Sequence, residues 1–373
     1  MRIAILTFTF QTNYGCILQA YALQTVLEKM GHEVEHLQEK DTNTSLHPMW
    51  KMPLVWCKRL LRKYLGGEKE LPIFANPYKF VRQNTDTFIT SYIHTRHLGA
   101  DEWNAKLAQD YDVIVFGSDQ IWRPIYARPL ERYFGSFIES SPIKRIAYAA
   151  SFGTDENEYS LEQIQRCSVL LSKFDAVSVR EQSAVSICKE RFGVEAIHVS
   201  DPTLLLDRND YIAFIQNAAI PSSKGTLGVY VLDENVQVQA FVEKISRQKG
   251  LKPFCMGSKV EDVYAPISER IHPPVEKWIR AFYDAELIVT DSFHGTVFSI
   301  LFHKPFICVG NFSRGMSRFH SLLNMFKLED RLVDMCSLNQ FSFPDIDWNS
   351  VDIILSNKRK EAKLFLETTL KSF

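Results

Sequence analysis

The sequence lacks the features that mark several common classes of protein. No window approaches the roughly 20 consecutive apolar residues that a membrane-spanning helix requires. Basic and acidic residues nearly cancel, with 43 Lys and Arg against 44 Asp and Glu and a formal net charge of -1, so there is no global basic field for nucleic acid. Residues 1–10 contain only a short apolar stretch that alternates with threonine, unlike a signal peptide. We therefore expect a cytoplasmic protein with no nucleic-acid partner.

Cysteine is sparse and scattered. The number of cysteines is odd, and no two of them stand in a CxxC pair. This argues against a disulfide framework and against a zinc site, and it favours reduced thiols in a cytosol. The seven residues are Cys16, Cys57, Cys167, Cys188, Cys255, Cys308 and Cys336.

The common nucleotide and metal motifs are also missing. The chain contains no GxxxxGK[ST], no GxGxxG and no HExxH. No Asp-x-Asp follows an expected strand, so a metal-held nucleotide sugar is not favoured. We expect no metal site and no bound cofactor.

What the sequence does contain is a repeated alternation of strand and helix. Residues 2–8 are β-rich, residues 16–31 have apolar side chains at helical spacing and end in glycine, and residues 32–37 form the next strand. Such a βαβ unit predicts a parallel sheet with a right-handed crossover. The alternation returns at residues 111–119, 145–153, 175–192 and 196–206, and a second series begins near residue 226.

The two series predict an α/β fold of two Rossmann-like domains with parallel sheets, in the GT-B-like arrangement known from glycosyltransferases. We expect an N-terminal domain (residues 1–216), a polar linker (217–224), a C-terminal domain (225–346) and a helical tail (347–373). Ligands of such sheets bind beyond the carboxyl ends of the strands. The active site is therefore expected in the interdomain cleft.

One insertion, residues 49–67, has an unusual composition. It combines five basic side chains with two tryptophans and a leucine pair. One interpretation is a surface helix with a solvated face. The other is a helix that docks on an anionic membrane surface.

Several of the expected strands are followed by polar turns. Asn13, Tyr14 and Gly15 open the first helix, which also carries Gln19. A glycine allows close backbone approach to a ligand, and helix N-termini attract anions or sugar hydroxyls. The same residues would also make an ordinary helix start.

Two further turns carry charge. Ser118, Asp119 and Gln120 stand beside an aromatic residue, which suits a hydroxyl-bearing substrate such as a sugar, although the aspartate could instead cap a helix. Arg180 and Glu181 directly follow another strand. That arginine is placed to bind a phosphate or carboxylate, or else to pair with Glu181.

The turn at residues 290–295 is the most informative one. Asp291 or Ser292 is expected to cap a helix whose first turn carries His294. An imidazole there could donate or accept a proton near neutral pH, although a lone histidine is often structural.

Two arginines follow the next expected strand, Arg314 and Arg318. Adjacent strands would bring Arg314 to the same rim as His294. With Arg180 across the cleft, these groups would form a cationic pocket for a small, highly charged anion.

Six stretches together resemble the polysaccharide pyruvyl transferase family over nearly the whole chain. They are NYGCILQAYALQTVLEKMGHEV, YDVIVFGSDQIW, RIAYAASFG, VSVREQSAV, VSDPTLLLD and LIVTDSFHGTVFSILFHKPFI. The resemblance implies a GT-B-like fold and an enzyme that transfers a pyruvyl group from phosphoenolpyruvate to two hydroxyls of a sugar, as a cyclic ketal, with release of phosphate. It also implies a cell-surface polysaccharide or a lipid-linked precursor as the acceptor.

The family's essential histidine falls on His294, its first-domain arginine on Arg180, and a further basic residue on Arg314. Several members have Arg-Leu-His where this chain has Ser292-Phe293-His294, so Arg314 or Arg318 would have to replace the missing arginine. The resemblance thus implies a general acid/base at His294 and a donor site that comprises Arg180, Ser292, His294, Gly295, Arg314 and Arg318.

The acceptor is expected on the N-terminal domain and the donor on the C-terminal domain. Asp119 would orient or deprotonate the acceptor hydroxyl, and the acceptor-binding residues would be Asn13, Tyr14, Gly15, Gln19, Ser118, Asp119 and Gln120. Two alternatives remain open. One is a GT-B glycosyltransferase that uses a nucleotide sugar, with Asp233 and Glu234 as weak candidates for binding ribose; the other is a non-catalytic glycan-binding protein.

Overall fold

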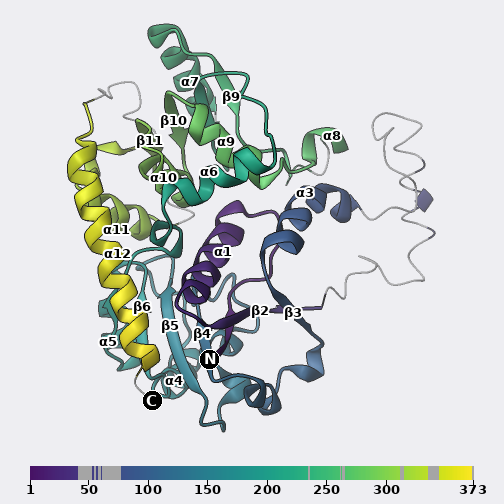
Figure 1. Cartoon of the computed structure of the whole chain (residues 1–373), viewed down its shortest axis with the longest axis vertical. Helices are drawn as coiled ribbons and strands as arrows, with labels where there is room; N and C mark the ends of the chain where they lie inside the picture. Colours follow the sequence, from purple (N-terminus) through teal and green to yellow (C-terminus); the bar gives the residue numbers. More distant parts are fainter. Residues whose placement is uncertain are drawn as a thin grey trace.

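A computed structural model describes residues 1–40, 53, 56, 57, 60, 77–233, 236–260, 262, 265–310, 315–334 and 344–371. The described residues form two parallel sheets (Figure 1). One has seven strands in the order β3-β2-β1-β4-β5-β6-β7, and the other has five in the order β12-β11-β10-β8-β9. The predicted fold of two Rossmann-like units is confirmed. The predicted insertion, residues 49–67, lies outside the described residues apart from four isolated positions.

The strands of the seven-stranded sheet are short and mostly buried, because helices cover both faces of a parallel sheet. All four residues of the central strand β4 are buried, for example. The strands are β1 (Arg2–Leu6), β2 (Glu33–Glu39), β3 (Thr95–Leu98), β4 (Val113–Phe116), β5 (Lys144–Ala150), β6 (Ala176–Val179) and β7 (Ile197–His198). The α-helices of this part are α1 (Tyr14–Lys29), α3 (Pro77–Tyr92), α4 (Leu161–Leu171), α5 (Gln182–Phe192) and α6 (Arg208–Asn217).

The five-stranded sheet follows α6, and the predicted linker, residues 217–224, falls between α6 and β8. Its strands are β8 (Leu227–Tyr230), β9 (Pro253–Cys255), β10 (Leu287–Thr290), β11 (Phe306–Val309) and β12 (Leu332–Val333). Its helices are α7 (Val236–Lys249), α8 (Ile267–Arg270), α9 (Val275–Asp284), α10 (Phe293–Leu301) and α11 (Ser317–Phe326). The chain ends in one long helix, α12 (Trp348–Lys371).

Each sheet has a point where the strand order reverses. In the first sheet β2 and β4 flank β1 on opposite sides. In the second sheet β9 and β10 flank β8 in the same way. The loops at such a point diverge to either side of the sheet and leave a crevice, which is where ligands of open α/β sheets bind.

The two units share one continuous apolar core. Tyr14 at the start of α1 stacks on His272 and Trp278 of the second unit, with ring centroids 4.3 and 5.2 Å apart. Its hydroxyl donates to the carbonyl of Pro273 at 2.7 Å. Burial of this aromatic group fixes the carboxyl ends of the two sheets against each other.

Helix α12 also connects the two units, as Figure 1 shows along one side of the molecule. At its start Trp348 stacks on His303, which follows α10. Near its end Phe365 lies against Tyr148 of β5, with ring centroids 6.2 Å apart. The expected tail is thus a single helix that begins on the second unit and returns to the first.

Candidate active site

The site is a cleft of about 1510 Å³ at the two points where the strand order reverses. Both units contribute to its wall. From the first come Phe8, Asn13, Cys16, Asp119 and Gln120, and from the second come Tyr230, Leu232, Asp291, Ser292, Phe293, His294 and Arg318. The structure thus has a cleft between the two units, where the sequence places the active site, and its identity as the active site stays a prediction.

His294 lies in the first turn of α10, which Ser292 caps. The Ser292 hydroxyl accepts from the Gly295 N–H at 3.4 Å. Asp291, the other predicted cap, instead accepts from the backbone N–H groups of Leu232 at 2.7 Å and Asp233 at 3.1 Å. The turn after β10 is thereby tied to the turn after β8, which fixes the direction in which His294 enters the cleft.

The imidazole of His294 is held on two sides by the first unit. Its Nε2 lies 3.6 Å from Oδ2 of Asp201, and its side chain is 8% exposed. A Cβ on Gly15 would collide with Nδ1 and the neighbouring carbons of the ring. Gly15 therefore acts by giving the ring room, and it is not itself part of the cleft lining.

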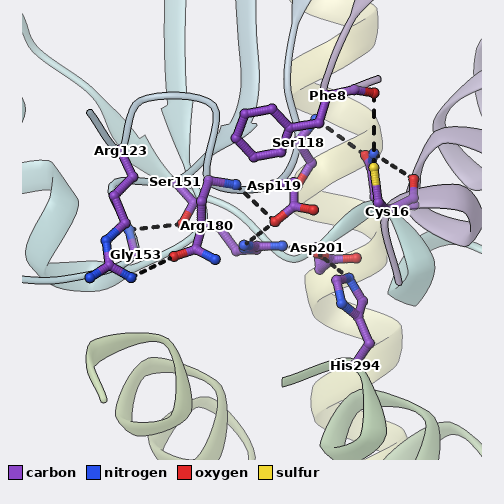
Figure 2. A network of polar contacts seen from close by, with 12 residues as sticks. Phe8, Cys16, Ser118, Asp119, Arg123, Ser151, Gly153, Arg180, Asp201 and His294 are labelled. Atoms are coloured by element: carbon purple, nitrogen blue, oxygen red, sulfur yellow. Dashed lines mark hydrogen bonds and ion pairs between the residues drawn. The ribbon is translucent and has the colours of Figure 1, made fainter. Parts of the chain in front are cut away.

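Asp201 lies between Arg180 and His294 (Figure 2). Its Oδ2 accepts from Nη1 of Arg180 at 2.8 Å, and its Oδ1 accepts from the backbone N–H and hydroxyl of Thr203 at 3.0 and 2.7 Å. Burial opposes ionisation of this carboxyl, but His294, Arg180 and Thr203 outweigh burial and hold the pKa of Asp201 well below its usual range. A buried ionised carboxylate thus faces the ring.

Arg180 pairs with protein groups through its two terminal nitrogens. Besides Asp201 it contacts Oδ1 of Asp119 at 3.5 Å, and its guanidinium lies 4.5 Å from the Phe293 ring centroid. Its side chain is 1% exposed and does not line the cleft. The expected contact of Arg180 with the donor therefore stays a prediction, and the ion pairs that it makes are with the two aspartates rather than with Glu181.

Asp119 and Gln120 reach the cleft as predicted for acceptor-facing groups. Asp119 has a φ of 75°, a left-handed conformation that costs energy in a residue other than glycine and recurs at functional sites. Its Oδ1 accepts from the Gln120 N–H at 2.8 Å. Asn13 also lines the cleft, while its Oδ1 caps α1 by accepting from the Cys16 N–H at 3.1 Å.

Gln19 and Ser118, by contrast, are fully buried and support the turn from behind. Gln19 donates to the Thr7 hydroxyl at 3.1 Å, and its side-chain oxygen accepts from the Ser118 N–H at 3.2 Å. The Ser118 hydroxyl donates to the Ala149 carbonyl at 3.0 Å. These groups bond to protein and, like Tyr14, lie behind the lining, so their expected contact with an acceptor stays a prediction.

Arg318 is the predicted donor-binding arginine that the structure places in the cleft. It lies in the first turn of α11, with its guanidinium 5.6 Å from the Phe293 ring centroid. Burial, together with the neighbouring Arg180, lowers the pKa of Arg318 to about 10. Arg314 lies outside the described residues. Gly295, the other donor-binding candidate, lies behind the lining, where a Cβ would collide with Thr290.

Sequence reasoning missed Asp201, which stands in the quoted stretch VSDPTLLLD without an assigned role. Its signal was an acidic residue directly after a strand and before proline, the pattern of a cap, and Asp201 does cap the 3₁₀ turn Pro202–Leu205. Its contact with His294 depends on how the two units meet. That arrangement could not be derived from a local motif.

The described part of the chain holds no group of three or more His, Cys, Asp or Glu side chains that could bind a metal ion. Among the described helices, none is long and apolar enough to cross a membrane. Six of the seven cysteines lie in the described part, and all six are free thiols.

Comparison with known proteins gives one family and several similar folds. The model of the family described as Polysaccharide pyruvyl transferase matches residues 13–314, whereas no curated protein matches in sequence. A UDP-GlcNAc 2-epimerase from Methanocaldococcus jannaschii is 12% identical, with a TM-score of 0.49 over 99% of both chains. The S. aureus MnaA–UDP structure is 12% identical, with a TM-score of 0.47 over 98% of this chain and 97% of that one. SsfS6, a Streptomyces sp. SF2575 glycosyltransferase, is 11% identical, with a TM-score of 0.43 over 98% of this chain and 99% of that one.

Proposed function

The chain belongs to the polysaccharide pyruvyl transferase family, and from this membership we propose that it transfers a pyruvyl group from phosphoenolpyruvate to two hydroxyls of one sugar. The acceptor is a sugar of a cell-surface polysaccharide or of its lipid-linked precursor, and the reaction takes place in the cytoplasm or at the inner face of the membrane. The observation that carries the proposal is the position of His294. It lies at a helix N-terminus inside the cleft, beside an ionised carboxylate.

The donor has a phosphate and a carboxylate, so its site must supply several positive or N–H groups. Arg318 provides a buried guanidinium in the cleft wall. The amino end of α10, where Ser292, Phe293 and His294 line the cleft, provides the favourable field of a helix N-terminus. We assign Arg318 to the donor, with Arg314 as a second candidate from outside the described residues.

The reaction needs one protonation and two additions. His294 gives a proton to the methylene carbon of phosphoenolpyruvate, which becomes a methyl group and leaves positive charge on the neighbouring carbon. One sugar hydroxyl bonds to that carbon and loses its proton. The C–O bond to phosphate then breaks with its electron pair, and the second hydroxyl adds and loses its proton. One of the two released protons ends on the phosphate and the other restores His294.

The acceptor is assigned to the first-unit wall of the cleft. Asp119 and Gln120 offer a carboxylate and an amide, and Asn13 stands beside them. A carboxylate in this position can orient a hydroxyl or accept its proton. The cleft, at about 1510 Å³, exceeds the roughly 300–1,000 Å³ usual for a single small ligand, so it has room for donor and acceptor together.

Phosphate release from phosphoenolpyruvate in the presence of candidate glycan acceptors tests the proposal, with mass analysis of the product. We expect acceptor-dependent phosphate release and a product that carries an added pyruvyl ketal. Transfer from a nucleotide sugar with no consumption of phosphoenolpyruvate would instead support the glycosyltransferase alternative. Glycan binding without any turnover would support the non-catalytic one.

A further inference from the structure

We propose that Asp201 is a positioning residue that orients His294 for proton transfer, and that this arrangement is complete only while the two units are in contact. The inference rests on the proposed function of His294 as the acid and names the group that makes it effective. Asp201 itself does not line the cleft. It acts through the histidine rather than on the substrate.

The two oxygens of Asp201 have different partners. Oδ1 accepts two hydrogen bonds from Thr203, at 3.0 and 2.7 Å, and so closes the turn that follows β7. Oδ2 accepts from Arg180 at 2.8 Å and faces His294 Nε2 at 3.6 Å. Oδ1 therefore stabilises the turn after β7, while Oδ2 lies between Arg180 and His294.

Arg180 offsets the energetic cost of burying the negative charge of Asp201. An isolated carboxylate with no exposed surface would be costly, and a buried cation at hydrogen-bond distance offsets that cost. The guanidinium also lies over the Phe293 ring at 4.5 Å and near Asp119 at 3.5 Å. Arg180 thus holds Asp201 on one side of His294 and Asp119 at the acceptor wall.

The arrangement also determines which nitrogen of His294 is available. Nε2 faces Asp201, so Nδ1 is the nitrogen left to exchange a proton. Gly15 lies on that side, where any Cβ would overlap the ring. The absence of a side chain at Gly15 lets the Nδ1 edge of the ring pack against the start of α1.

The parts come from both units. His294 begins α10 in the second, whereas Asp201 follows β7 and Gly15 lies in α1 of the first. Rotation of one unit away from the other would separate the ring from both neighbours. The acid is thus assembled at the contact between the two units, and closure of the cleft is coupled to its activation.

Replacement of Asp201 by asparagine tests the assignment. In Asp201→Asn the side-chain oxygen can still accept from Thr203, while the negative charge beside His294 is lost. We expect kcat to fall about 10²-fold, the loss typical of a misplaced catalytic group, with little change in KM for phosphoenolpyruvate. In a His294→Gln background, Asp201→Asn should cause no further loss.

Thr203→Val is the matched control, because it removes only the hydroxyl contact to Oδ1. It should lower the melting temperature and leave turnover close to that of the wild type. A second readout needs no substrate. In protein labelled with ¹⁵N-histidine, the His294 ring N–H, assigned by its absence in His294→Gln, should be protected from solvent exchange and should exchange faster in Asp201→Asn.

The outcomes separate this inference from the proposed function. Loss of ring protection in Asp201→Asn, in a protein that transfers no pyruvyl group to any acceptor, would refute the function and support the positioning role. Additive losses of turnover in the double variant would overturn the positioning role. It would also be overturned if ring exchange were unchanged and Asp201→Asn and Thr203→Val lost equal turnover.

Discussion

Residues at the cleft fall into two groups. Some line the cleft, and others lie behind the lining and hold it in place. His294, Asp119 and Arg318 line the cleft. Arg180 and Asp201 have side chains with almost no exposed surface and pair with each other at 2.8 Å. Substitutions in the first group should change turnover more than folding, whereas substitutions in the second group should change both.

His294→Gln belongs to the first group. Its Nε2 has no hydrogen-bond partner among the described residues, and the Asp201 carboxylate that it faces keeps its ion pair with Arg180 at 2.8 Å, so the fold should survive loss of the imidazole. We expect turnover to fall by about 10²–10⁴, the usual effect of losing a general acid, and the melting temperature to stay within a few degrees. Phosphate release and thermal unfolding measure the two effects. An unfolded variant would show that the histidine is structural.

Gly15→Ala should separate local helix stability from activity. Alanine favours a helix over glycine by at most about 1 kcal/mol, and Gly15 lies in the first turn of α1. Its new methyl group would nevertheless overlap the His294 ring. We therefore expect a large loss of turnover while the far-UV circular dichroism spectrum stays native. Full activity in this variant would contradict the close contact between α1 and His294.

The individual strands and helices show how far sequence alone predicts the structure. Buried parallel strands such as β4 and β10 were predicted because they are continuous apolar runs between turns. The polar edge strand β3, whose residues are partly exposed, and the helix α3 before it were not anticipated. In the site, His294 and its cap Ser292 follow from one local strand–turn–helix pattern. The Arg180–Asp201–His294 contacts do not, because they join three separate elements across two sheets.

Strand β2 carries a buried histidine, His36, that makes stability depend on pH. Burial, together with the nearby His94, lowers its pKa to about 3. An unfolded histidine titrates near 6.5, so the unfolded chain binds the extra proton between these values. The free energy of unfolding should therefore fall as pH drops below about 6.5, by at most about 1.4 kcal/mol per pH unit from this residue.

Denaturant unfolding of the wild type and His36→Leu at pH 7.5 and pH 5.0 checks this effect. His272 has a pKa lowered to about 4 and shifts stability in the same direction, so the comparison of the two proteins isolates His36. The variant should lose less stability on acidification. An equal loss in both would show that His36 does not set the pH dependence.

At the scale of the whole molecule, the two units are joined by packing that extends beyond the cleft. Arg359 of α12 donates from Nε to the Leu204 carbonyl at 2.6 Å, and its Nη2 donates to the Leu206 carbonyl. Leu204 and Leu206 follow Asp201 closely in the sequence. Helix α12 thus supports, from outside, the turn whose Asp201 faces His294.

Arg359→Ala should lower the free energy of unfolding by about 1.5–3 kcal/mol, the range for losing a hydrogen bond to a charged group. Lys363 lies on the exposed face of the same helix, so Lys363→Ala is the control and should change stability by less than about 0.5 kcal/mol. Chemical denaturation followed by circular dichroism measures both. Equal stability of the two variants would show that α12 contributes little at this point.

The return of α12 to the first sheet means that the chain crosses between the two halves of the molecule twice, once between α6 and β8 and once along α12 itself. Two connections prevent the units from moving apart. They restrict the relative motion of the units to rotation about the line through both connections. For the proposed reaction, we therefore expect entry of a bulky glycan to require a rotation rather than a separation of the units. We expect this rotation to move His294 away from Asp201, which would protect the donor from protonation until the acceptor has bound.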